Sequence, residues 1–209
     1  VGTYRTERDS LKELSEAGAQ LFQCDFYQEN QVAGLAQAVA GHCSSLRAVI
    51  HNASDWLPEN AGVPASEIMR RMMQVHVSAP YLLNMALAPL LQETSASHGD
   101  IIHVGDYVST RGSKKHIAYA ASKAAQDNLT LSFSASLAPR IKVNSIAPAL
   151  VIFNDDDDEQ YREKARGKSL MQREAGLEEF QRTVDYLLDS VYVTGRILHM
   201  DGGRHLKVA

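Results

Sequence analysis

Short apolar runs alternate along this chain with longer stretches whose residues can form helices. The runs are four to six residues long, which is a usual length for buried strands. They lie at residues 19–24, 46–51, 100–105, 141–146 and 197–200. The helical candidates lie at residues 7–17, 29–42, 65–91, 115–138, 156–170 and 178–190. This alternation predicts an α/β fold: a doubly wound parallel sheet with helices on both of its faces.

We expect a single domain over residues 1–209. No internal repeat or low-complexity linker divides the chain, and its length suits one α/β domain with a large core better than two domains. The composition is that of a soluble globular protein, with 44% hydrophobic residues, 22% charged residues and a formal net charge of -4. That charge balance gives no support to a nucleic-acid partner.

The two cysteines, Cys24 and Cys43, are too few for a disulfide framework and lie in no metal-ligand spacing. We therefore expect no metal site and a reducing, cytoplasmic compartment. Residues 72–91 lack Asp, Glu, Lys and Arg, which raises the alternative of a membrane span. Pro80 and Pro89 interrupt this run and favour a buried soluble helix. The N-terminus has no apolar stretch of the kind that a signal peptide needs.

Residues 1–6 are typical of the end of a strand that leads into a loop. In a doubly wound nucleotide fold, the first strand and a glycine-rich turn hold the pyrophosphate on backbone N–H groups. This sequence has no such turn, and no helix of useful length follows Gly202 and Gly203. We therefore expect the first strand and the glycine-rich loop to be absent from this chain, either by truncation or because the protein is a shortened variant.

The most specific chemical feature is the pair Tyr119 and Lys123, which lie four residues apart and so share one face of a helix. A tyrosine is a poor acid or base at neutral pH, because its ordinary pKa is about 10. A nearby ammonium stabilises the phenolate and lowers that pKa, so the pair is suited to proton transfer. The alternative is a surface pair on an amphipathic helix.

Other residues around this pair change the balance. Residues 51–54 follow an apolar strand, Asp106 follows another, and residues 143–148 follow the helix that carries the pair. In this order the chain resembles the short-chain dehydrogenase/reductase family, which implies a Rossmann-like fold. Asp106 lies thirteen positions before Tyr119, where most members of the family have a serine. A carboxylate there resembles the pteridine reductases, and the combination of motifs is similar to the bacterial dihydromonapterin reductase subgroup.

Trp56 and Arg5 extend the resemblance. Trp56 stands where pteridine reductases place an aromatic ring that stacks on the pterin, a flat substrate that needs such a wall. The alternative is a lone tryptophan at a boundary between a loop and the core. Arg5 and Thr6 follow a strand end where members that prefer NADPH place a cation and a hydroxyl for the 2′-phosphate. A surface salt bridge is the alternative for Arg5.

The resemblance implies a full set of contacts with NADPH, and it assigns the adenine edge to Asp25. The implied cofactor contacts are Arg5, Thr6, Asp25, Phe26, Asn52, Ala53, Ser54, Tyr119, Lys123, Pro148 and Val151. His76 replaces an asparagine that helps to hold a water in the proton relay of many members, and a core histidine is the alternative. The acidic residues 154–159 are read as a solvated helix start at the position of the family's substrate loop.

We expect an NADPH-dependent reduction of a dihydropterin to its tetrahydro form, with dihydromonapterin, a related dihydropteridine or dihydrofolate as substrate. Asp106, Tyr119 and Lys123 are the expected catalytic residues, and Trp56, Asp106 and Tyr119 are expected to contact the substrate. A carbonyl reductase of the same family and a binding protein that has lost catalysis are the alternatives. The family is usually tetrameric, and alanines on one face of the 115–138 helix suit packing between subunits, so we expect a homotetramer.

Overall fold

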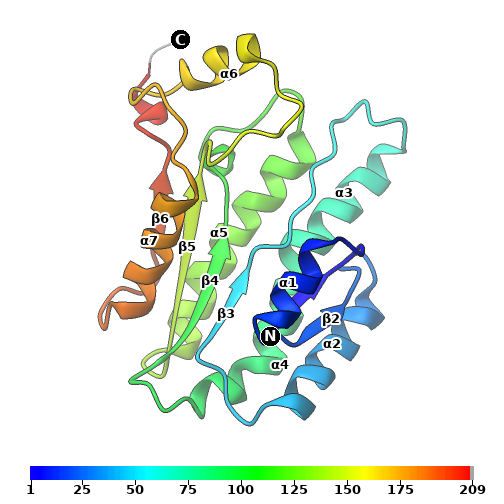
Figure 1. The fold of residues 1–209 in the computed structure, drawn as a ribbon, viewed down its shortest axis with the longest axis vertical. Helices are drawn as coiled ribbons and strands as arrows, with labels where there is room; N and C mark the ends of the chain where they lie inside the picture. Colours follow the sequence, from blue (N-terminus) through cyan, green and yellow to red (C-terminus); the bar gives the residue numbers. More distant parts are fainter. Residues whose placement is uncertain (208–209) are drawn as a thin grey trace.

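The computed structural model describes residues 1–207, in which strands and helices alternate (Figure 1). The strands are β1 (Gly2–Tyr4), β2 (Leu21–Gln23), β3 (Ala48–His51), β4 (Gly99–Val104), β5 (Ile141–Pro148) and β6 (Ile197–Met200). The longer helices are α1 (Ser10–Glu16), α2 (Glu29–His42), α3 (Ala65–Met73), α4 (Ala79–Gln92), α5 (Ile117–Leu137), α6 (Glu159–Arg166) and α7 (Leu177–Asp189). Short helical turns are η1 (Gln74–Ser78), η2 (Tyr107–Thr110) and η3 (Arg204–Leu206).

Every ladder between these strands is parallel, which confirms the predicted class of fold. The prediction of one sheet is wrong in one respect, because the strands form a pair, β1-β2, and a separate sheet in the order β3-β4-β5-β6. A cavity of about 350 Å³ lies between the facing edges of β1 and β3 and is lined by residues of both. Their backbone groups therefore do not reach one another to pair.

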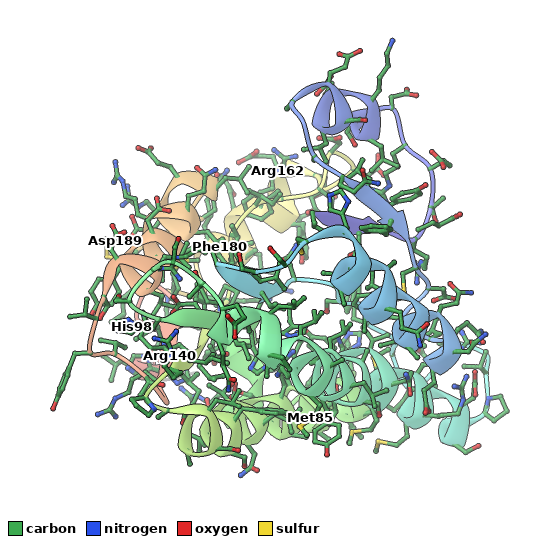
Figure 2. All side chains as sticks on the ribbon, turned by 90° about the horizontal axis from the view of Figure 1, so that it is seen from below. Met85, His98, Arg140, Arg162, Phe180 and Asp189 are labelled. Atoms are coloured by element: carbon green, nitrogen blue, oxygen red, sulfur yellow. The ribbon has the colours of Figure 1, made fainter. Side chains whose placement is uncertain are left out.

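Helices cover both faces of the four-stranded sheet, as predicted. On one face, Ile101 and Val143 pack against side chains of α4 and α5. On the other face, Ile102 and Ile146 pack against α7, whose Phe180 turns towards the sheet (Figure 2). The neighbouring isoleucines of β4 face opposite sides because side chains alternate along a strand.

The predicted 65–91 helix contains a π-helical turn, η1, between α3 and α4. The apolar residues Leu83, Leu87 and Leu91 of α4 are buried in the core. None of the helices in the described part of the chain combines the length and the apolar character needed to cross a bilayer.

The carboxyl ends of the parallel strands lie at one edge of the molecule, and the predicted chemical residues follow them. Arg5 follows β1, Asp25 follows β2, Asn52 follows β3, and Asp106 follows β4. Open α/β sheets bind ligands at this edge. Gly202, after β6, leads only into the three-residue turn η3, as the sequence predicted.

Candidate active site

Asp106 is held at the end of β4 by its own backbone turn. Its Oδ1 accepts a hydrogen bond from the backbone N–H of Val108 at 2.8 Å and so caps η2. The preceding residue, Gly105, has no room for a side chain, because a Cβ there would lie 2.9 Å from Ser145 Oγ on the neighbouring strand. The carboxylate therefore leaves the sheet with its second oxygen directed to α5.

That second oxygen meets the predicted tyrosine. The hydroxyl of Tyr119 donates to Oδ2 of Asp106 at 2.7 Å. Burial raises the pKa of Tyr119 above its usual value, and the Asp106 carboxylate raises it further through its charge and the hydrogen bond. The polar Ser54 hydroxyl nearby acts in the opposite sense on this pKa. The two residues thus hold one proton between a phenol and a carboxylate.

Lys123 lies one helical turn after Tyr119 and is 2% exposed. Its Nζ donates to the backbone oxygen of Val104 at 2.8 Å and lies 5.8 Å from the centre of the Tyr119 ring. Burial lowers the pKa of Lys123 to about 8, although the Asp106 and Asp127 carboxylates oppose that shift. The prediction that Lys123 lowers the pKa of Tyr119 is wrong for this structure, because the ammonium faces a carbonyl and the phenol faces a carboxylate.

His76 connects the loop after β3 to helix α5. Its Nδ1 lies 2.8 Å from Ser122 Oγ, and its Nε2 lies 2.9 Å from Ser54 Oγ. The Ser122 hydroxyl gives its one hydrogen to the backbone oxygen of Tyr119 at 2.7 Å, so it accepts from Nδ1–H of His76. Nε2 is then free to accept the hydrogen of Ser54. The ring is neutral, because burial and then the Lys123 cation lower the pKa of His76 to about 3.

The π-helical turn η1 is the element that places His76. Its wider spacing carries His76 fully into the interior, where its ring meets the Tyr119 ring edge-on with centroids 5.3 Å apart. Hydrogen bonds therefore connect Ser54, His76, Ser122 and the backbone oxygen of Tyr119 in one chain, and the hydroxyl of Tyr119 continues it to Asp106. The alternative prediction of a simple core histidine misses this connection to the tyrosine.

Seven of the predicted cofactor residues line one cavity of about 410 Å³ at the ends of β1, β2 and β3. They are Arg5, Thr6, Asp25, Phe26, Asn52, Ala53 and Ser54. Pro148 and Val151 line a second cavity, of about 790 Å³, which also includes Asn52. The structure thus distributes the predicted contacts over two hollows that share Asn52, and Tyr119 and Lys123 line neither of them.

The chemistry of the first cavity suits the adenosine end of a nicotinamide dinucleotide. Arg5 and Arg8 bring positive charge and Thr6 brings a hydroxyl, which are groups that bind phosphate. Asn52 joins this end to the second hollow, where apolar residues such as Val151 could face a flat ring. The donor set therefore fits a phosphorylated dinucleotide.

Two of the predicted binding residues already have partners within the protein. Arg5 already forms an ion pair, with NH1 3.1 Å from Oδ2 of Asp55. Trp56 is 63% exposed, and its ring lies tilted over the His116 ring with centroids 4.5 Å apart. Trp56 is thus available as a stacking face, and the alternative of a surface salt bridge for Arg5 is present in the structure.

The sequence did not predict the contacts of Asp55 and Ser122, or the hydrogen bond between Ser54 and His76. Ser122 lies three residues after Tyr119 on α5, so helical spacing could have placed it beside the tyrosine. Asp55 carried no signal beyond its position next to Trp56, because its partner Arg5 is fifty residues away in the sequence.

Comparison with known proteins shows relatives over nearly the whole chain. The family described as enoyl-(acyl carrier protein) reductase matches residues 1–205. Dihydromonapterin reductase of Klebsiella pneumoniae is 54% identical over 99% of this chain and 86% of its own length, and that of an Enterobacter strain is 53% identical over the same shares.

Solved structures agree with this result. FolM alternative dihydrofolate reductase 1 from Brucella canis, complexed with NADP, is 27% identical with a TM-score of 0.81, over 95% of this chain and 78% of that one. The Pseudomonas aeruginosa RhlG/NADP active-site complex is 25% identical with a TM-score of 0.84, over 94% of this chain and 81% of that one.

Proposed function

Because the chain belongs to the short-chain dehydrogenase/reductase family, we propose that it reduces a dihydropterin to the tetrahydro form with NADPH. The observation that carries this proposal is the hydrogen bond of 2.7 Å between Tyr119 and the carboxylate of Asp106. The names of the relatives, dihydromonapterin reductase and alternative dihydrofolate reductase, support the same class of substrate.

The reaction adds a hydride to the carbon of a C=N bond and a proton to its nitrogen. When bound, the nicotinamide supplies the hydride. Tyr119 supplies the proton to the nitrogen. Asp106 is half-buried and can take a proton from solvent, which it returns to Tyr119. One hydride and one proton therefore enter the substrate.

The side chain of Asp106 also favours a pterin over a ketone as the substrate. A carbonyl oxygen accepts a hydrogen bond from a neutral hydroxyl such as serine, whereas an ionised carboxylate has no hydrogen to give it. An imine nitrogen is more basic than a carbonyl oxygen, so it can be protonated before the hydride arrives, and a carboxyl group that relays protons to Tyr119 suits that order of events. Trp56 then provides the exposed ring on which the substrate stacks.

Lys123 and Arg5 are proposed to hold the cofactor. The Nζ of Lys123 donates to Val104 O and to Gln126 Oε1 and keeps one further hydrogen, which can reach a hydroxyl of the nicotinamide ribose. Arg5 is proposed to bind the 2′-phosphate with Thr6. Replacement of Arg5 by Ala should therefore weaken NADPH binding more than NADH binding, because only NADPH carries that phosphate. Equal losses would show that Arg5 does not read it.

Self-association is proposed from the outer face of the helical layer. Tyr81 and Met85 on α4 and Ile117 and Leu131 on α5 are large apolar side chains left exposed, and Figure 2 shows Met85 on the outside of this layer. Exposed apolar surface of this kind is typical of subunit interfaces. A homotetramer should appear at four times the chain mass in sedimentation, and a monomer at all concentrations would contradict it.

The experiment that tests the proposed reaction follows NADPH oxidation by the purified protein. The substrates are dihydromonapterin, dihydrobiopterin, dihydrofolate and a panel of simple ketones, with NADH as the control cofactor. We expect turnover of at least one dihydropterin with NADPH and much weaker turnover of the ketones. Preference for a ketone would support a carbonyl reductase, and nucleotide binding without turnover of any substrate would support a binding protein.

A further inference from the structure

The carboxylate of Asp55 contacts two different parts of the site. Its Oδ2 accepts hydrogen bonds from Arg5 at 3.1 Å and from the hydroxyl of Tyr27 at 2.7 Å, and both partners follow strands at the cofactor cavity. Its Oδ1 accepts a hydrogen bond from the backbone N–H of Trp56 at 2.8 Å. One side chain therefore joins the cation at the adenosine end to the backbone of the exposed tryptophan.

The ion pair between Arg5 and Asp55 is weak enough for a phosphate to displace the carboxylate from Arg5. The side chains of Arg5 and Asp55 are 55% and 28% exposed, and ion pairs with this much solvent contact contribute little. Burial acts to raise the pKa of Asp55, but hydrogen bonds from Tyr27, from the Trp56 amide and from Arg5 outweigh it and lower that pKa. Asp55 is thus charged at neutral pH and carries a negative charge at the edge of a phosphate-sized site.

We propose that Asp55 is a positioning residue that couples the 2′-phosphate end of the cofactor cavity to Trp56, with Arg5 as the shared partner. This inference rests on the proposed function, in which Arg5 binds that phosphate. A phosphate that takes the guanidinium leaves Asp55 with Tyr27 alone as its side-chain partner. The carboxylate then moves away from the phosphate, and the adjoining Trp56 moves with it. A ligand bound at the adenosine end of the cavity thus changes the position of Trp56, on which the substrate is proposed to stack.

The fluorescence of Trp56 reports changes in the surroundings of this residue. It is the single tryptophan of the chain, so all tryptophan fluorescence comes from this position. The cavity that holds Arg5 is lined by Asp55, whereas Trp56 lies outside its lining. Trp56 instead lies over His116, and a change in that contact alters the emission of the indole. A small ligand confined to the adenosine end cannot touch Trp56 and can change its emission only through the protein.

The experiment titrates the protein with adenosine 2′,5′-bisphosphate and, in parallel, with AMP, which lacks the 2′-phosphate. Calorimetry gives the affinity and the fluorescence of Trp56 gives the response of the loop. We expect the bisphosphate to change the emission and AMP to leave it unchanged at equal saturation. In Asp55→Asn, which retains an oxygen for the Trp56 amide, the bisphosphate should bind up to about fivefold more tightly and no longer change the emission.

A matched control is Glu178→Gln, which neutralises another exposed carboxylate paired with an arginine, Arg182, on α7. This variant should keep both the affinity and the fluorescence change of the unmodified protein. The proposal is overturned if the bisphosphate binds without changing the emission, if Asp55→Asn keeps the change, or if that variant binds the bisphosphate no more tightly. Failure of the unmodified protein to prefer the bisphosphate over AMP would instead refute the proposed role of Arg5, and the coupling with it.

Discussion

The hydroxyl of Tyr119 has a single hydrogen, and the structure directs it to Asp106. Removal of that hydroxyl in Tyr119→Phe should lower turnover by a factor on the order of 10² or more, because the proton path to the substrate is lost. Affinity for adenosine 2′,5′-bisphosphate should stay unchanged, since Tyr119 does not line the adenosine cavity. Steady-state kinetics and calorimetry check the two parts, and near-normal turnover would refute the assigned role.

His76 makes a different prediction at the same scale. Replacement by Leu removes its hydrogen bonds to Ser54 and Ser122, and turnover should fall about tenfold, which corresponds to about 1.4 kcal/mol. His76→Gln, which keeps a donor and an acceptor, should recover part of the loss. The pH profile of turnover should keep its shape in both variants, because His76 is neutral throughout the working range. Loss of a limb near pH 6.5 would show that His76 itself titrates.

The residues of the site were predictable to different degrees. Helical spacing placed Tyr119 and Lys123 on one face, and the interval of thirteen residues brought Asp106 to them. The effect of Lys123 was not predictable, because spacing does not say which oxygen an ammonium faces, and here it faces a backbone carbonyl. Asp55 and Arg5 come together only in the tertiary fold, so no local sequence pattern predicts their ion pair.

At the scale of elements, periodicity located the long helices and every strand except β1, and the strand at 197–200 and the helix at 29–42 have the predicted bounds. The 141–146 strand continues to Pro148, because its last residues pair with β6. The π-helical turn η1 was not foreseen, since its residues differ in no obvious way from those of an ordinary helix.

The base of the sheet contains a charged cluster that attaches α7. Asp100, fully buried at the start of β4, pairs with Arg47 and with Lys142, whose Nζ lies 2.9 Å from it. Lys142 also donates to the backbone oxygens of Leu187 and Ser190 at the end of α7, where the helix dipole favours a cation.

Lys142→Met should therefore lower the free energy of unfolding by about 3 to 5 kcal/mol, because it leaves a buried carboxylate with less compensation. The exposed pair Arg182 and Glu178 on α7 provides the control, and Arg182→Ala should cost less than about 0.5 kcal/mol. Urea denaturation measures both variants. Similar small losses in the two would show that burial adds nothing to the cluster.

For the molecule as a whole, the fold class and the family predicted from the sequence are confirmed by the parallel ladders and by the relatives. The division into two sheets was not predicted, because strand patterns report which segments are extended and not which edges meet. The predicted absence of a first strand and glycine-rich loop stays a prediction.

The stability of the whole molecule should decrease in mild acid. Burial lowers the pKa of His51 to about 4, that of His76 to about 3 and that of His103 well below its usual value. The unfolded chain, with histidine pKa values near 6.5, therefore binds more protons below that pH. The stabilisation is complete above about pH 6.5 and is lost as the pH falls towards 4, by about 1.4 kcal/mol per pH unit for each histidine.

Urea denaturation between pH 7.5 and 4.5 tests this dependence. The variant His51→Gln retains a side-chain donor for Asn84. In this variant the free energy of unfolding should depend less steeply on pH, by the equivalent of about one bound proton. NMR of the folded protein should show no titration of these three rings above about pH 5. A ring that titrates near pH 6.5 in the folded state would contradict the assignment for that residue.

We propose that the carboxylate of Asp106 adapts this short-chain reductase to an imine substrate, and the variant Asp106→Ser examines that role. Turnover of a dihydropterin and of a ketone with NADPH is measured for this variant and for the unmodified protein. Pterin turnover should fall while any ketone turnover is unchanged or higher, because serine places a neutral hydroxyl beside Tyr119. Unchanged pterin turnover, or a loss confined to the ketone, would contradict it.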